Sequence, residues 1–299
     1  MTLSIRAAGL IGVGAACLSL LAANPSQAWW PKGHAVIARG ALKALPAEVP
    51  AFFRGAGELV GHLSYDPDVQ KNRATPTLRA AEDPEHYLDF ELLQGKPLPK
   101  TRYDYYRLCS QLKVDPTNAG TVPYSITEWT EKLTVAFAEH RKWPTNMSIQ
   151  TKCQFYAGIL AHYAGDVCMP LHTTIHFDGR AGADGKSPRS GIHARLDSLI
   201  ERLDLKPEQL AMQQKPAAIP DLFAGVMAQI ENSRSRIDRS YELEPRLPPQ
   251  NEREAWTPNP EAREFGIERG RESVRFLASL YLTAWKNSEK LPLPSWLQR

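Results

Sequence analysis

The chain has 299 residues, of which 42% are hydrophobic and 23% carry a charge. This composition supplies enough apolar material for a sizeable core, so it excludes a disordered or fibrous protein. The formal net charge of +3 is too small for a protein dedicated to polyanions, so any contact with nucleic acid would be local. The sequence contains no internal repeat and no low-complexity tract.

The N-terminal segment 1–28 has the pattern of a cleavable secretory signal peptide. Its run over 7–23 is almost wholly apolar but lies at the short limit for crossing a bilayer, which disfavours a membrane anchor. A lipoprotein signal acting through Cys17 is a weaker alternative. We expect cleavage after Ala28, which would leave 29–299 as a secreted or periplasmic protein.

Apolar residues of the mature segment recur mostly at intervals of three and four, which is typical of amphipathic helices. The expected helices in chain order are 34–45, 125–141, 148–169, 193–202, 220–239 and 263–287. Between them lie long segments rich in Pro, Gly and Asp that we expect to be irregular loops, namely 60–85, 96–123 and 173–190. The pattern predicts one multi-helix, all-α domain with no internal boundary.

Three cysteines remain in the mature segment: Cys109, Cys153 and Cys168. Cys153 and Cys168 are expected on one helix, roughly 22 Å apart at ~1.5 Å per residue, which is too far for a disulfide. A disulfide, if one forms, therefore uses Cys109. No C-x-x-C spacing is present, which argues against metal binding by thiolates.

Histidine and aspartate are placed like metal ligands near the end of the third expected helix. His162 and Asp166 are four residues apart, so both project from one helix face and can share a metal ion. His172 follows six residues later, and His193 with Asp197 repeats the spacing of four. A lone buried histidine is usually a packed core residue, but this set of three histidines and two aspartates at regular spacing favours a metal site. Imidazole and carboxylate donors without thiolate suit zinc.

Three other segments supply further candidate ligands. His86 follows a proline, and Asp66 and Asp68 lie in a Tyr-Asp-Pro-Asp sequence. His34 lies five residues after Trp29, which would become the first residue on signal cleavage.

These features together resemble the zinc-dependent nuclease S1/P1–phospholipase C superfamily. The resemblance covers about 29–200. It consists of Trp29 as the first residue after signal cleavage, the dipeptide Gly33-His34, the motif H-x-x-x-D-x-x-x-P-L-H that begins at His162, and the motif H-x-x-x-D that begins at His193. No single one of these motifs is specific, whereas the combination is. The last third of the chain contributes only its helical character.

The resemblance implies three zinc ions in a cleft of an all-α fold. The implied ligands are Trp29 (α-amine and carbonyl), His34 and Asp166 for the first ion; Asp68, His86, His162 and again Asp166 for the second; and His172, His193 and Asp197 for the third. A carboxylate between two close cations lets them share a water and lower its pKa towards ~7. The resulting hydroxide would attack phosphorus, while the third ion neutralises charge on the phosphate.

The sequence departs from the nuclease branch around the second ion. With Asp68 as ligand, Lys71 takes the place of an arginine that stabilises the transition state, and it supplies charge without a bidentate fork. Asp66 is the alternative carboxylate. His62 is the alternative to His86, because it precedes the acidic sequence as a ligand histidine does in the phospholipase C branch. We expect His62, His140 and His176 otherwise to be loop or surface histidines.

Other residues bear on the choice of branch. The short gap from Trp29 to His34 and the use of Asp197 are typical of nucleases, and Tyr87 is placed to stack on a base. We therefore expect a zinc-dependent endonuclease or 3′-nucleotidase that acts on single-stranded nucleic acid as a monomer, without an obligate protein partner. The alternative is a phospholipase C acting on phospholipid head groups. The second alternative is a non-enzymatic, secreted zinc-binding protein.

Overall fold

The computed structural model describes residues 29–251 and 253–298, so the expected signal peptide lies outside the described residues. All regular elements in this part are helices, apart from one isolated bridge between Phe177 and Gly179. The prediction of an all-α fold is therefore confirmed. None of the described helices combines the length and the apolar character needed to cross a membrane.

The helices vary from single turns to one of 28 residues. In chain order, with η for 3-10 helices, they are α1 (Pro31–Ala44), α2 (Ala51–Arg54), α3 (Gly57–Leu63), α4 (Asp66–Gln70), α5 (Pro76–Glu82), η1 (Asp83–His86), η2 (Phe90–Leu93), α6 (Arg102–Leu112), α7 (Pro116–Ala119), α8 (Val122–Lys142), α9 (Met147–Asp166), η3 (Pro170–Thr173), α10 (Ile192–Asp197), α11 (Leu199–Arg202), α12 (Pro207–Ala211), α13 (Leu222–Arg234), α14 (Ile237–Glu242), η4 (Glu244–Arg246), α15 (Pro260–Asn287) and η5 (Ser288–Lys290).

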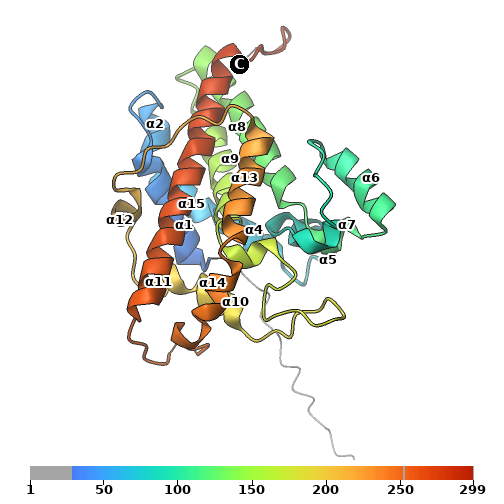
Figure 1. Ribbon diagram of the computed structural model, residues 1–299. Coiled ribbons are helices and arrows are strands. Elements are labelled where there is room, and N and C mark those ends of the chain that lie inside the picture. The colour runs from blue at the N-terminus through green and yellow to red at the C-terminus, as the bar shows by residue number, and fades with distance from the viewer. Residues whose placement is uncertain (1–28, 252, 299) are drawn as a thin grey trace, which may run out of the picture.

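The long helices α8, α9 and α15 form the centre of the molecule, with α1 beside them (Figure 1). Asn146 begins α9 by accepting hydrogen bonds from the backbone amides of Ser148 and Ile149, and Asn259 caps α15 in the same way. The second half of α9 is buried all round, because α1, α3, α8 and α15 all pack against this helix. Polar residues at its C-terminal end are therefore enclosed by protein.

Two of the three segments expected to be loops contain helices. The segment 60–85 holds most of α3 and all of α4 and α5, and 96–123 holds α6 and α7, while 173–190 is irregular as expected. The prolines in these segments suggested helix breaks, but several lie in the first turn of a helix, where no intrahelical amide is needed.

Other expected elements differ in detail. The helix expected over 148–169 ends at Asp166, and those over 193–202 and 220–239 are each divided in two. The three cysteines from Cys109 onward are all buried and unbridged. The expectation of a loop or surface position is wrong for His140, which is buried in α8 with its ring 4.4 Å from that of Phe52.

Close approach of α3 to α9 depends on Gly158. A Cβ added there would lie 2.3 Å from the Cβ of Leu63, a distance that real contacts do not reach. Leu63 is followed by Ser64, whose carbonyl faces a histidine of α9. This contact therefore couples helix packing to the site.

We predict that Gly158→Ala lowers the free energy of unfolding by about 1–3 kcal/mol, because the two helices must separate. Thermal or urea unfolding would measure the change. Gly57→Ala is the matched control, because its added Cβ meets only the Cγ of Arg39 at 3.6 Å. Equal stability of the two variants would contradict the role of Gly158.

Candidate metal centre

The structure brings all the side chains predicted as ligands into one buried region. In each of three groups the ligand atoms lie within 4.8 Å of one another. The groups are His34, His162 and Asp166; Asp68, His86 and His162; and His172, His193 and Asp197. The sequence led us to expect three zinc ions, and the structure offers three sets of residues that could each hold one ion. His162 belongs to two groups, whereas the sequence implied it for the second site alone.

Short elements at one end of the central helices position these side chains. His34 lies in the first half of α1, while His162 and Asp166 occupy the last turns of α9. The other ligands come from elements of four to six residues: Asp68 from α4, His86 from η1, His172 from η3, and His193 and Asp197 from α10.

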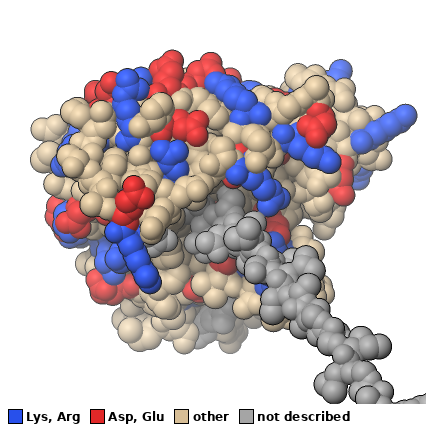
Figure 2. All heavy atoms as spheres, turned by 90° about the horizontal axis from the view of Figure 1, so that it is seen from below, with Lys and Arg blue, Asp and Glu red and all other residues tan. Residues whose placement is uncertain are grey.

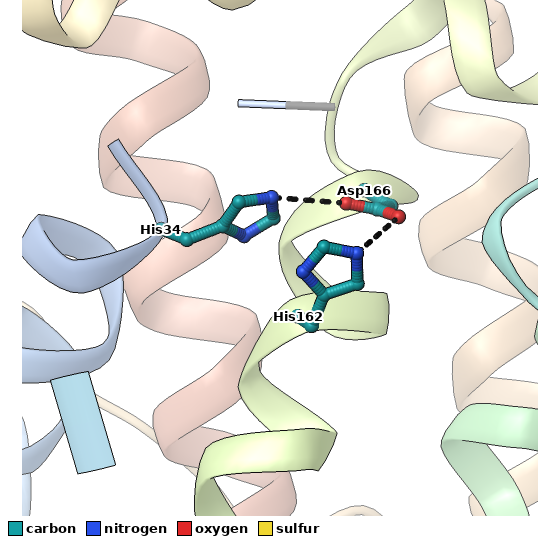
Figure 3. Close-up of side chains that lie close together, drawn as sticks. All are labelled: His34, His162 and Asp166. Atoms are coloured by element: carbon teal, nitrogen blue, oxygen red, sulfur yellow. Dashed lines mark ion pairs between the residues drawn. The ribbon is translucent and has the colours of Figure 1, made fainter. Parts of the chain in front are cut away.

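Asp166 faces two histidines, with one carboxylate oxygen toward each (Figure 3). Its Oδ1 is 3.4 Å from Nε2 of His34, and its Oδ2 is 3.4 Å from Nε2 of His162. The two rings stack with their centroids 4.2 Å apart. Each carboxylate oxygen thus faces a different histidine of the first group, and His162 also belongs to the second group. Asp166 itself belongs to the first group alone, whereas the sequence implied it for the second site as well. Bridging by Asp166 remains a prediction.

The environment of Asp166 disfavours its charge unless a cation is present. Burial, and then the nearby charge of Asp68, raise the pKa of Asp166 well above its usual value. Neither carboxylate oxygen accepts a hydrogen bond from any described residue. An isolated buried carboxylate is costly, and a metal ion would compensate that cost.

Backbone carbonyls fix the protonation of three ligand histidines. Nδ1 of His86 lies 2.9 Å from the carbonyl oxygen of Glu82, Nδ1 of His162 lies 2.9 Å from that of Ser64, and Nδ1 of His172 lies 3.0 Å from that of His86. A carbonyl only accepts, so each Nδ1 carries the proton and each Nε2 presents a lone pair to the cluster. Burial lowers the pKa of all three imidazoles, which favours the neutral form that binds metal.

In the second group, one oxygen of Asp68 faces both imidazoles. Its Oδ1 is 3.7 Å from Nε2 of His86 and 3.8 Å from Nε2 of His162. The same oxygen lies 2.6 Å from Nζ of Lys71, and both side chains of this ion pair are almost fully buried. A cation therefore already contacts the predicted ligand.

The alternative ligands lie outside this group. Asp66 is only partly buried, and His62 is exposed with its Nδ1 bonded to the hydroxyl of Tyr65 at 2.9 Å. The structure therefore places Asp68 and His86 with His162, and it does not bring Asp66 or His62 to them.

The third group is the tightest. Nε2 of His193 is 2.9 Å from Nε2 of His172 and 3.0 Å from Oδ2 of Asp197. Burial raises the pKa of Asp197 to about 6, although the nearby His193 opposes this shift. The carboxylate of Asp178 accepts hydrogen bonds from the amides of Gly191 and His193 and so holds the start of α10 in place.

Trp29 is fully buried beside the first group. Its indole nitrogen donates to the carbonyl of Gly165 at 3.1 Å. A Cβ added at Gly165 would lie 3.2 Å from Nδ1 of His34 and 3.5 Å from Cδ1 of Trp29, so these three residues are closely packed. The ligand role of its α-nitrogen remains a prediction.

Sequence reasoning missed Glu82. Its carboxylate is buried and accepts a hydrogen bond from the hydroxyl of Tyr163, while its backbone carbonyl orients His86. Burial raises the pKa of Glu82. Its position four residues before His86 was the available signal, but that spacing is common on helix surfaces.

Arg102 holds the segment that carries His86. Its guanidinium binds both carboxylate oxygens of Glu85, and the hydroxyls of Thr121 and Ser125 donate to the same carboxylate. Because Glu85 precedes His86 directly, this network orders η1 against α6 and α8.

The donor chemistry fits zinc. The clusters offer imidazole nitrogen and carboxylate oxygen, and the Nε2 atoms of His86 and His162 have no hydrogen-bond partner among the described residues. Backbone carbonyls behind the imidazoles are the usual outer partners of metal-binding histidines.

Comparisons with known proteins find only distant likeness. No family model and no curated protein matches the chain. Similar solved structures include the alpha toxin from Clostridium absonum, with a TM-score of 0.46 and 13% identity over 86% of this chain and 63% of that chain. They also include the alpha-toxin from an avian strain of Clostridium perfringens, with a TM-score of 0.45 and 14% identity over 87% of this chain and 65% of that chain. This chain thus spans less than two thirds of either toxin's length, and likeness at this level does not extend to activity.

Asp166 and Asp197 differ in the number of metal sites for which each is predicted as a ligand. We predict that Asp166→Asn loses roughly two of three zinc ions and nearly all activity, whereas Asp197→Asn loses roughly one ion. The reason is that Asp166 contacts His162, which belongs to two groups, whereas Asp197 contacts His193, which belongs to one. Elemental analysis of the purified variants would measure this difference, and equal zinc content would contradict the predicted bridging role of Asp166.

Proposed function

We propose that the chain is a secreted, zinc-dependent hydrolase of phosphate ester bonds. The observation that carries this proposal is the set of three buried His/Asp groups, two of which share His162. Zinc bound there would polarise phosphate oxygens and supply a nucleophile at neutral pH.

The chain's own residues would hold and orient this chemistry. Asp166 would bridge the first two ions from its place beside His34 and His162, and the backbone carbonyls keep the Nε2 atoms of the histidines aimed inward. The ammonium of Lys71 adds positive charge beside the second group, which would stabilise negative charge on a phosphate. Trp29 is fully buried and packs with His34 around Gly165, beside the first group.

A purely structural role for zinc is the competing hypothesis. Structural zinc sites are usually closed by four protein ligands, whereas catalytic sites leave one position open. The third group has three side-chain ligands, His172, His193 and Asp197. Three protein ligands would leave one position open on a bound zinc ion, which supports an enzyme.

For the substrate, we propose a phospholipid head group ahead of nucleic acid. The hydroxyl of Tyr87 donates to the carbonyl of Thr117 at 2.5 Å and its ring packs against Gly120, which restricts stacking on a base. In the view of Figure 2, basic side chains are interspersed with acidic ones and form no continuous basic track. Val69 and Leu78 are 62% and 42% exposed. Val69 lies on α4, the helix that carries Asp68, and Leu78 lies on the contacting helix α5, so these exposed apolar side chains suit a lipid.

We predict that the zinc-loaded protein hydrolyses bis(p-nitrophenyl) phosphate and phosphatidylcholine, and that a chelator abolishes both activities until zinc is restored. Single-stranded DNA, RNA and 3′-AMP, assayed in parallel, test the nuclease alternative. Faster turnover of these than of phosphatidylcholine would reverse the substrate proposal. Zinc binding without hydrolysis of any substrate, from mildly acidic to mildly basic pH, would contradict the enzyme proposal and favour a non-enzymatic zinc-binding protein.

We further predict that the protein needs a free α-amine on Trp29. An acylated nitrogen has no available lone pair, because resonance with the carbonyl uses it. A protein with one extra residue before Trp29 should therefore bind less zinc and turn over more slowly than the form that begins at Trp29. Equal zinc stoichiometry and equal turnover in the two forms would show that the α-amine is not a ligand.

A further inference from the structure

Lys71 is an unusual neighbour for a metal site, because it brings a positive charge to a predicted ligand. It directly follows α4, so that its side chain returns to Asp68 three residues earlier. The ammonium and the carboxylate are 2.6 Å apart, with the two side chains 6% and 2% exposed. This pair is therefore enclosed by protein and little screened by solvent.

The oxygen that Lys71 contacts is the one that a second-group metal would use. Oδ1 of Asp68 faces Nε2 of both His86 and His162, at 3.7 and 3.8 Å. An ion bound to these three atoms would lie close to the ammonium. A divalent and a monovalent cation would then share one carboxylate oxygen in a buried space, where like charges repel strongly.

The charge of Lys71 affects several residues of the cluster. After burial, it is the second largest cause that lowers the pKa of His86 and of His162. It also lowers the pKa of Asp166, against the effect of burial, because it stabilises the negative carboxylate. An ammonium in this place thus does part of what a metal ion would do for the buried carboxylates.

We propose that Lys71 is a resident cation that stabilises the metal-free site and competes with zinc for Asp68. Lys71 thereby sets the zinc affinity of the second group below the value that its three ligands alone would give. With zinc held by Asp68, the ammonium would have to leave Oδ1 and could then contact a phosphate. The inference rests on the metal centre of the proposed function and is independent of the substrate.

Zinc affinity in Lys71→Met tests the proposal. Zinc-loaded protein is titrated with a chelator of known affinity, and the dissociation constants of the ions are compared with those of the unaltered protein. We expect one ion to bind at least about tenfold more tightly in the variant, because a nearby positive charge has been removed. Lys71→Gln keeps a hydrogen-bond donor without the charge and should behave like Lys71→Met, whereas Lys71→Arg keeps the charge and should not.

Thermal stability supplies a second readout. Without zinc, Lys71→Met leaves the Asp68 carboxylate uncompensated, so its melting temperature should fall by about 5 °C or more. With zinc bound, this deficit should disappear. Lys152→Met is the matched control, because Lys152 pairs with the buried Glu139 at 2.5 Å, far along α9 from the cluster. It should lower the melting temperature equally with and without zinc and leave zinc affinity unchanged.

The outcomes separate this inference from the proposed function. Unchanged or weaker zinc binding in both Lys71→Met and Lys71→Gln would overturn the competition. If Lys71→Met does not fold without zinc, the chelator titration of zinc-loaded Lys71→Gln decides. Failure of the unaltered protein to bind zinc would overturn the metal centre itself.

Discussion

The burial of three aspartates among histidines is the constraint on which the rest of the structure depends. Asp68, Asp166 and Asp197 lie within the core end of the helical bundle and are almost completely shielded from water. A buried carboxylate needs a cation or several hydrogen-bond donors, and each of these faces imidazole nitrogen atoms. The arrangement makes physical sense as a set of metal ligands, and much less sense as core packing.

The fold satisfies this constraint by enclosing the end of one helix. The last turns of α9 present His162 and Asp166 together, and α1 brings His34 against them. The remaining ligands come from short elements that could not hold their shape alone. They are fixed by links such as the Arg102–Glu85 ion pair beside His86 and the Asp178 cap of α10. Rigid placement of this kind is what a site needs if it is to bind several cations in fixed relative positions.

The second group combines two opposing demands. As a metal ligand, Asp68 would need a compensating charge before metal binds and would have to bind metal afterwards, and Lys71 would affect both. An ammonium is well suited to this because its side chain is flexible and its charge is compact, whereas an arginine fork would be harder to displace. A lysine rather than an arginine at position 71 thus has a physical consequence at this group.

The sequence by itself determined the helical class and the pairing of His162 with Asp166 and His193 with Asp197, because a spacing of four places two side chains on one helix face. It also indicated which residue types would gather, since the donors needed for zinc are few. Only the tertiary structure showed that Asp68 and His86, rather than Asp66 and His62, lie beside His162, and that His162 faces two groups. Local spacing leaves both members of each pair equally plausible. The choice depends on contacts between α4, η1 and α9, which are distant in sequence and meet only when the bundle packs.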